Sequence, residues 1–220
     1  MRLILFIVSL LPLNLIAQDT LSHFSLGASI EGDWCDRRST IDGDQQFLKS
    51  QYDSLETGRI RGGLGFCLQY RMNNNLSIQS GVNYIMRGYR IDTISESELT
   101  NLRYNFNYIE LPVYLNLKFR NEKKIQPMLF IGASFRYLVH MQTKFYQMGI
   151  NTEKVDAEND DILPFAVNAC VGIGFSKNIY DRTRLQIAGL FNQSITAITE
   201  SPYKRFLNSA GIQIAITRDI

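Results

Sequence analysis

Apolar and polar side chains alternate without a break across residues 60–72. The even positions carry isoleucine, glycine, leucine, phenylalanine, leucine, tyrosine and methionine, and the odd positions carry two arginines, two glycines, a cysteine and a glutamine. Successive side chains of a β-strand point to opposite faces, so this segment is predicted to be a strand with one apolar and one polar face. Arginine and glycine are unusual in a protein core but typical of the lumen of a small barrel whose outside faces lipid.

The same alternation recurs along the chain and predicts eight strands. In seven of them the apolar positions keep one phase, whereas in the fourth the apolar positions change from even to odd near Asn107 or Tyr108. One extra residue there would produce this change, so we predict a β-bulge, with a second irregularity at Pro112, which cannot donate to a ladder. The predicted strands are 24–34, 59–72, 76–90, 103–119, 125–140, 163–176, 184–194 and 206–218.

The connections between these segments alternate in length. Residues 73–75, 121–124 and 177–183 form short turns, whereas 35–58, 91–102, 141–162 and 195–205 form longer, polar loops. Short turns at one end and long loops at the other are the layout of outer-membrane barrels, whose turns lie in the periplasm. The predicted fold is therefore all-β, an eight-stranded antiparallel up-and-down transmembrane β-barrel with a lipid-facing outside and a polar, filled lumen.

Aromatic residues on the predicted outer face cluster near the strand ends, as expected for two interfacial girdles. The loop-side girdle comprises Trp34, Tyr104, Phe106, Tyr137, Phe165 and Phe206, and the turn-side girdle comprises Phe24, Tyr70, Phe119 and Phe175.

The N-terminal residues 1–17 resemble a secretion signal. Arg2 precedes an apolar stretch, and Ala17 offers a small residue at the cleavage point, which leaves residues 18–220 as a single barrel domain. The chain carries 23 basic and 21 acidic residues, and this near-balance argues against nucleic-acid binding. No apolar run beyond residue 20 is long enough for a membrane-spanning helix.

Several charged residues fall on the predicted inner face. Because unpaired buried charges are costly, we expect them to form a hydrogen-bonded network that either plugs the lumen or gates a narrow ion path. Glu110 is the member whose removal should loosen the barrel most clearly. The candidate network comprises Glu31, Asp33, Arg59, Arg61, Arg71, Arg87, Glu110, Arg136 and Arg184.

Other candidate chemistry is weaker. His140 is predicted to face inward at the loop end, with Ser134 and Asp33 as conceivable neighbours, but no nucleophile motif accompanies it. Cys67 and Cys170 are predicted on opposite walls, which argues against a disulfide between them, and Cys35 is either free or paired between molecules. The acidic stretch 153–161 either binds calcium or is a solvated loop, and no metal or cofactor site is predicted.

Part of the sequence is similar to a known family. The segment from Asn107 to Pro112 contains Tyr108, Glu110 and Pro112 in a Tyr-hydrophobic-Glu-hydrophobic-Pro motif. Together with the signal ending at Ala17 and the glycine-containing fifth and last strands, this motif resembles the PorT-like outer-membrane β-barrel domain proteins of Bacteroidetes. The resemblance implies an eight-stranded barrel in the outer membrane of a Gram-negative bacterium, and some members of that family serve the type IX secretion system.

The sequence thus predicts a monomeric, non-enzymatic outer-membrane barrel with both termini in the periplasm. Its expected partners are outer-membrane lipid and an envelope or secretion-machinery protein. The loop 35–58 either folds over the mouth of the barrel or contacts such a partner, and the sequence assigns no role to the loop 141–162. Two alternatives remain open at this point: a soluble lipocalin-like barrel that binds a small apolar ligand, and an envelope enzyme that acts on lipid A.

Overall fold

Eight strands of this chain form a closed barrel, in a computed structural model that describes residues 23–41, 56–95, 98–119, 125–147, 150–155, 162–199 and 203–220. The predicted signal 1–17 and most of the 35–58 loop lie outside these residues. No described helix is long and apolar enough to cross a membrane. The strands are β1 Phe24–Ile41, β2 Glu56–Arg71, β3 Leu76–Ser95, β4 Glu98–Lys118, β5 Ile125–Gln147, β6 Ile150–Val155, β7 Phe165–Tyr180, β8 Thr183–Ser194 and β9 Tyr203–Asp219.

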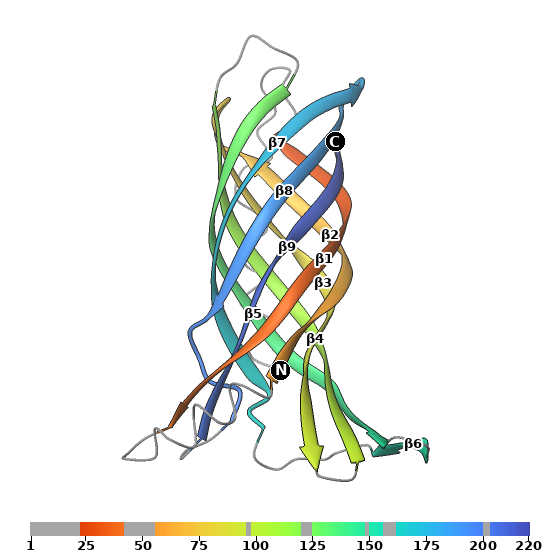
Figure 1. Cartoon of the computed structure of the whole chain (residues 1–220). Helices are drawn as coiled ribbons and strands as arrows, with labels where there is room; N and C mark the ends of the chain where they lie inside the picture. The colour runs from red at the N-terminus through yellow and green to blue at the C-terminus, as the bar shows by residue number, and fades with distance from the viewer. Residues whose placement is uncertain are drawn as a thin grey trace, which may run out of the picture.

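Each of the eight wall strands pairs antiparallel with two neighbours, so the sheet closes into a ring (Figure 1). The order β4-β3-β2-β1-β9-β8-β7-β5 is completed by pairing between β4 and β5, while β6 pairs with β5 outside this ring. Closure satisfies the backbone hydrogen-bonding groups that an open sheet edge would expose to lipid. The predicted eight-stranded fold is confirmed.

The start of β1 and the end of β9 lie side by side at one end of the barrel, where Ile220 N donates to Phe24 O at 3.0 Å. We name this the turn end, and the opposite end, where β1 finishes at Ile41, the loop end. The turn end is uppermost in Figure 1. Asp181 and Arg182 connect β7 to β8 there, and Arg182 adopts the left-handed backbone region at φ 59°. This connection is shorter than predicted because β7 and β8 extend further.

Apolar side chains cover the outside of the wall. Phe66 is 74% exposed and Ile173 is 71% exposed, whereas their inward neighbours Cys67 and Gly172 are buried. This orientation is the one predicted for lipid, and it is the reverse of a lipocalin-like barrel, whose outer face is polar. The soluble alternative is therefore rejected.

The strands extend further at the loop end than the sequence pattern predicts. β1 continues to Ile41, β3 and β4 form a long hairpin up to Ser95 and Glu98, and β5 continues into a hairpin with β6. Figure 1 shows these hairpins extending below the barrel. Beyond the lipid both faces of a strand can be polar, so the backbone ladder continues there without the alternation that marks the wall.

The predicted irregularity at Asn107 and Tyr108 is present, but the extra residue is in β5. Asn107 pairs with His140 and Tyr108 pairs with Leu138, so Val139 is the unpaired residue. The β3–β4 register is unchanged throughout, although its ladder is interrupted opposite Pro112. β4 therefore keeps its phase, and the sequence interpretation assigned the bulge to the wrong strand.

Because the bulge lies in β5 and not in β4, the predicted orientations of three side chains are wrong. Phe106 is buried inside the barrel and Tyr104 lies in the same phase, so neither belongs to the outer girdle. His140 is exposed and not inward, because Val139 shifts the phase of β5 between Leu138 and Met141. An extra residue moves every later side chain to the opposite face.

Aromatic residues at the other predicted girdle positions lie on the outer face. Trp34, Tyr137 and Phe165 are exposed at the loop end, and the rings of Tyr137 and Phe165 lie 5.0 Å apart. At the turn end the rings of Phe24 and Tyr70 lie 4.9 Å apart. Such aromatic belts mark the two membrane–water interfaces. The remaining members of the turn-end girdle, Phe119 and Phe175, are exposed. Phe206, the remaining member of the loop-end girdle, is half-buried.

Replacing Leu64 by arginine should destabilise the folded barrel by about 2–4 kcal/mol, the cost of a cation near the bilayer midplane. Leu64 is 63% exposed and lies about midway between the two aromatic belts on β2. The free energy of unfolding, measured by denaturant titration in lipid vesicles, tests this. Tyr70→Arg, at the turn-end belt, is the matched control and should cost less than about 1 kcal/mol. Equal costs at both positions would contradict the assignment of the lipid-facing band.

Candidate functional site

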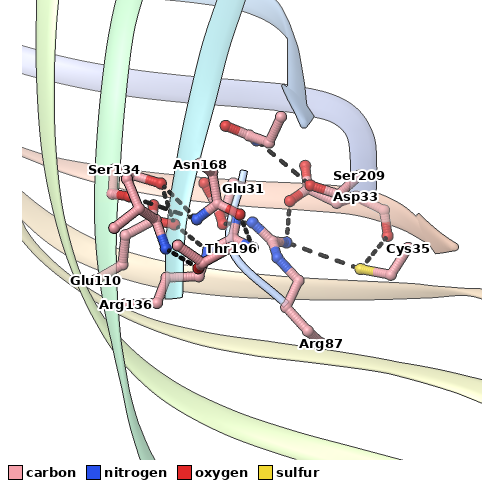
Figure 2. A network of polar contacts seen from close by, with 12 residues as sticks. Glu31, Asp33, Cys35, Arg87, Glu110, Ser134, Arg136, Asn168, Thr196 and Ser209 are labelled. Carbon is pink, nitrogen blue, oxygen red and sulfur yellow. Dashed lines mark hydrogen bonds and ion pairs between the residues drawn. The ribbon is translucent and has the colours of Figure 1, made fainter. Parts of the chain in front are cut away.

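The middle of the lumen holds five charged side chains, Glu31, Asp33, Arg87, Glu110 and Arg136, which we call the central charge belt (Figure 2). The alternation of β1, β3, β4 and β5 directs all five inward. They form two groups, one around each arginine. Three carboxylates face two guanidinium groups.

Arg87 of β3 joins the two carboxylates of β1. Its Nη2 donates to Glu31 Oε1 at 3.0 Å, and its Nη1 donates to Asp33 Oδ2. The Sγ of Cys35 lies 3.9 Å from Nη1. The Arg87 side chain is 1% exposed, so water cannot replace these partners. One guanidinium therefore bridges two buried carboxylates.

Arg136 of β5 forms the second group. Its Nε donates to Glu110 Oε2 at 2.7 Å, and its Nη1 donates to Asn168 Oδ1 at 3.1 Å. Ser134 Oγ donates to the same Glu110 oxygen at 3.1 Å, and Asn168 Nδ2 donates to Ser134 Oγ at 3.2 Å. Figure 2 shows these side chains converging from β4, β5 and β7. The group links three adjacent strands by side-chain hydrogen bonds.

A glycine provides the room that Asp33 occupies. Gly211 of β9 pairs directly with Asp33, and a Cβ built on it would overlap Asp33 Oδ1 and the Gly32 carbonyl oxygen. Any larger residue at 211 would displace the carboxylate from Arg87. This is how an inward glycine allows a long charged side chain to fill a narrow lumen.

An apolar layer fills the lumen on the loop-end side of the belt. Tyr89 stacks against Tyr104 and Phe106, with ring centroids 4.8 and 6.1 Å apart. Ile198, between β8 and β9, packs into this layer and is 1% exposed. The buried members of this loop-end apolar layer are Ile85, Tyr89, Phe106, Tyr108, Met141, Ala166, Ile198 and Leu207.

A second apolar cluster lies on the turn-end side of the belt. Its buried members are Tyr114, Met128, Phe130, Cys170, Ala188 and Leu190. The lumen is filled, as predicted, but it is not uniformly polar, because apolar side chains pack on both the loop-end side and the turn-end side of the charges. The sequence interpretation missed the loop-end apolar layer because it assigned Tyr104 and Phe106 to the outer face.

Four predicted network residues lie elsewhere. Arg59 and Arg61 donate to Asn105 Oδ1 of β4, next to the register shift between Gly58 and Gly63. Arg71 and Arg184 both bind Asp219 at the turn end, Arg71 at 3.0 Å. The structure therefore divides the predicted network into three separate groups.

Partners of the belt that the sequence did not single out are polar residues in inward phase. Asn168 and Cys35 are both buried at inward positions, and Ser134, which the sequence offers as a possible neighbour of His140, donates to Glu110 instead. Arg37 and Glu56 form a further ion pair near the loop end, within the predicted loop 35–58. The position of Asn168 on the inward face of a predicted strand could have identified it as a lumen residue. Arg37 lies in a predicted loop, where no alternation indicates which way a side chain points.

Neither histidine reaches the belt. His140 is exposed on the outer face, and His23 lies at the turn end with its Nδ1 3.2 Å from Arg71 O. All three cysteines are buried and free, so Cys35 is inaccessible to a second molecule. No group of metal-ligating side chains occurs within the described ranges. The side chains of the acidic stretch 153–161 lie outside them.

The sequence matches the family described as the outer membrane protein beta-barrel domain over residues 23–200. The match covers most of the chain. The chain belongs to this family. No curated protein is similar enough in sequence to count as a match. Membership of this family, together with the closed ring and its lipid-facing outside, places the barrel in the outer membrane.

Solved structures of outer-membrane barrels resemble this member of the family. The outer membrane protein OprG from Pseudomonas aeruginosa is 12% identical, covers 89% of this chain and 94% of its own, and has a TM-score of 0.51. Neisserial surface protein A is 13% identical, covers 92% of this chain and 100% of its own, and has a TM-score of 0.46. At these identities the OprG likeness supports the fold alone.

The three motif residues of the sequence resemblance share the inner face of β4. Tyr108 and Glu110 are each 1% exposed, and Pro112 is buried in the same phase. Tyr108 packs in the loop-end apolar layer and Glu110 in the belt. The motif therefore bridges the apolar and charged levels of the lumen.

Proposed function

We propose that this outer-membrane barrel is a closed, monomeric and non-enzymatic envelope protein that acts through its loop end. The filled lumen carries the proposal. Arg87 and Glu110 are 1% exposed, and apolar layers pack on both sides of them. A charge belt sealed in this way supports the structural plug over the ion gate, because ions would need a hydrated path that side chains occupy.

Two observations favour this proposal over an enzyme acting on lipid A. Ser134 contacts Glu110 of the belt, but neither histidine lies near enough to act as its base. Ser134 Oγ also donates to a carboxylate that Arg136 holds. A nucleophilic serine needs a base within hydrogen-bond reach and access to substrate.

The proposed topology places both termini and the short turns in the periplasm and the long hairpins outside the cell. It follows from the general layout of such barrels, in which long loops are extracellular. The hairpins β3–β4 and β5–β6 extend past the wall and offer surface to an envelope partner.

A link to type IX secretion is a finer proposal that depends on the motif Tyr108, Glu110 and Pro112 alone. Undiminished export of type IX cargo in a strain that lacks this chain would contradict the link. The closed-barrel proposal would stand unaffected.

Purified barrel in planar bilayers should produce no conductance steps above the bare bilayer. Its lumen is filled at the level of Arg87 and again at the level of Phe106. The double variant Tyr89→Ala and Phe106→Ala removes two rings of the loop-end apolar layer and should conduct more often than the wild type. Trp34→Ala, which removes an outer ring, is the matched control and should stay closed. Discrete, regular steps from the wild type would contradict the plug.

A further inference from the structure

The turn end of the barrel opens into a hollow of about 860 Å³. It lies apart from the central charge belt, on the far side of the turn-end apolar cluster. We call it the turn-end hollow. Its lining residues are Arg71, Asn73, Asn74, Asn75, Lys118, Phe119, Gln126, Asn178, Asp181, Arg182, Arg184 and Asp219.

Positive charge exceeds negative charge in this lining. Four cationic side chains, from Arg71, Lys118, Arg182 and Arg184, face two carboxylates. Arg71 and Arg184 share a single carboxylate, Asp219, which also accepts from Ser25 Oγ at 2.6 Å. One carboxylate cannot neutralise two guanidinium groups, so the pair retains an excess positive charge.

Lys118 adds to this excess. It ends β4 and is only 7% exposed, although it lines the hollow. No carboxylate among the described residues forms an ion pair with its ammonium group, and its backbone N–H is already used by Asn75 O at 2.6 Å. Asp219 acts electrostatically on this ammonium group but is already shared by Arg71 and Arg184, so the local excess of buried positive charge makes a bound anion favourable at this point.

We infer that the turn-end hollow binds a phosphate group through Lys118, Arg71 and Arg184. Guanidinium groups match the oxygens of a tetrahedral oxyanion bidentately, and a lysine adds a point charge. The amide side chains of the lining supply further neutral donors. The phosphate belongs either to a soluble periplasmic solute or to a lipid headgroup, since Phe119 lies in the turn-end aromatic belt at the membrane interface.

Isothermal titration of inorganic phosphate into the detergent-purified barrel tests the site, with chloride holding the ionic strength constant. The wild type should bind phosphate, and Lys118→Met should weaken the affinity about tenfold or more, because a charge-assisted contact is lost. Lys118→Arg keeps the charge and should retain binding. Lys177→Met, an exposed lysine of β7 outside the hollow, should bind like the wild type.

A second arm distinguishes the source of the phosphate. Native mass spectrometry should detect phosphatidylglycerol retained by the wild type and lost from Lys118→Met if a lipid headgroup occupies the hollow. Binding of free phosphate without lipid retention supports the soluble source instead. Absence of both, or equal binding by Lys118→Met, overturns the inference. Unboiled gels establish that each variant is folded, and Arg71→Gln provides a second test if Lys118→Met does not fold.

Discussion

Replacing Arg87 by methionine should destabilise the barrel more than any other single change in its lumen. Glu31 and Asp33, whose side chains are 6% and 3% exposed, would lose the guanidinium that both contact. Breaking one buried ion pair costs about 3–5 kcal/mol, and here two carboxylates are left without a partner. We expect a loss at or above this range in the free energy of unfolding, measured by denaturant titration in detergent or lipid.

The triple variant Arg87→Met, Glu31→Gln and Asp33→Asn is the control for this result. It removes the buried charges together, so most of the lost stability should return. If Arg87→Met unfolds like the wild type, the belt does not hold the wall strands together. If the triple variant is as unstable as the single one, packing and not charge is responsible.

Replacing Glu110 by glutamine should destabilise the barrel by about 3 kcal/mol, at the lower end of the cost of breaking a buried ion pair. Arg136 would lose its 2.7 Å partner but keep Asn168 at 3.1 Å, so this effect should be smaller than that of Arg87→Met. The folded fraction on unboiled gels should fall at a lower temperature, and the unfolding midpoint in denaturant should shift down.

A matched change at an exposed ion pair separates charge loss from burial. Asp92 binds Arg90 at 2.8 Å with both side chains about one-third exposed, so Asp92→Asn should cost less than about 1 kcal/mol. The double variant Glu110→Gln and Arg136→Met should recover part of the loss. Equal effects of Glu110→Gln and Asp92→Asn would show that Glu110 is effectively solvated.

The wall of the barrel was predictable because its side chains face only two environments. Lipid outside and a narrow lumen inside impose period two on every spanning segment, so Leu64, Phe66 and Ile173 could be assigned to the outer face from sequence. Strand ends beyond the lipid were not predictable, because neither face of the β3–β4 hairpin must be apolar there. The same absence of pattern concealed β6.

The inner charges were predictable one by one, but their partners were not. Period two places Glu31, Arg87, Glu110 and Arg136 inside without stating which strands lie close together or at which height. The registers of β1 against β2 and of β2 against β3 decide that Arg87 meets Asp33, and the register of β4 against β5 decides that Arg136 meets Glu110. The register between two strands is set by hydrogen bonds between residues that are distant in the sequence. The alternation within one segment therefore does not predict it.

The sequence by itself determined the number of wall strands, the inward position of the central charges and, away from the bulge, the face of each strand that meets lipid, since these follow from local alternation. The tertiary structure alone decided where the bulge lies. An extra residue at Val139 in β5 and one in β4 would both reconcile the two patterns, and only pairing distinguishes them. Because β4 has no extra residue, Phe106 points into the lumen and helps to seal it with aromatic side chains, whereas the extra residue in β5 turns His140 out of the lumen.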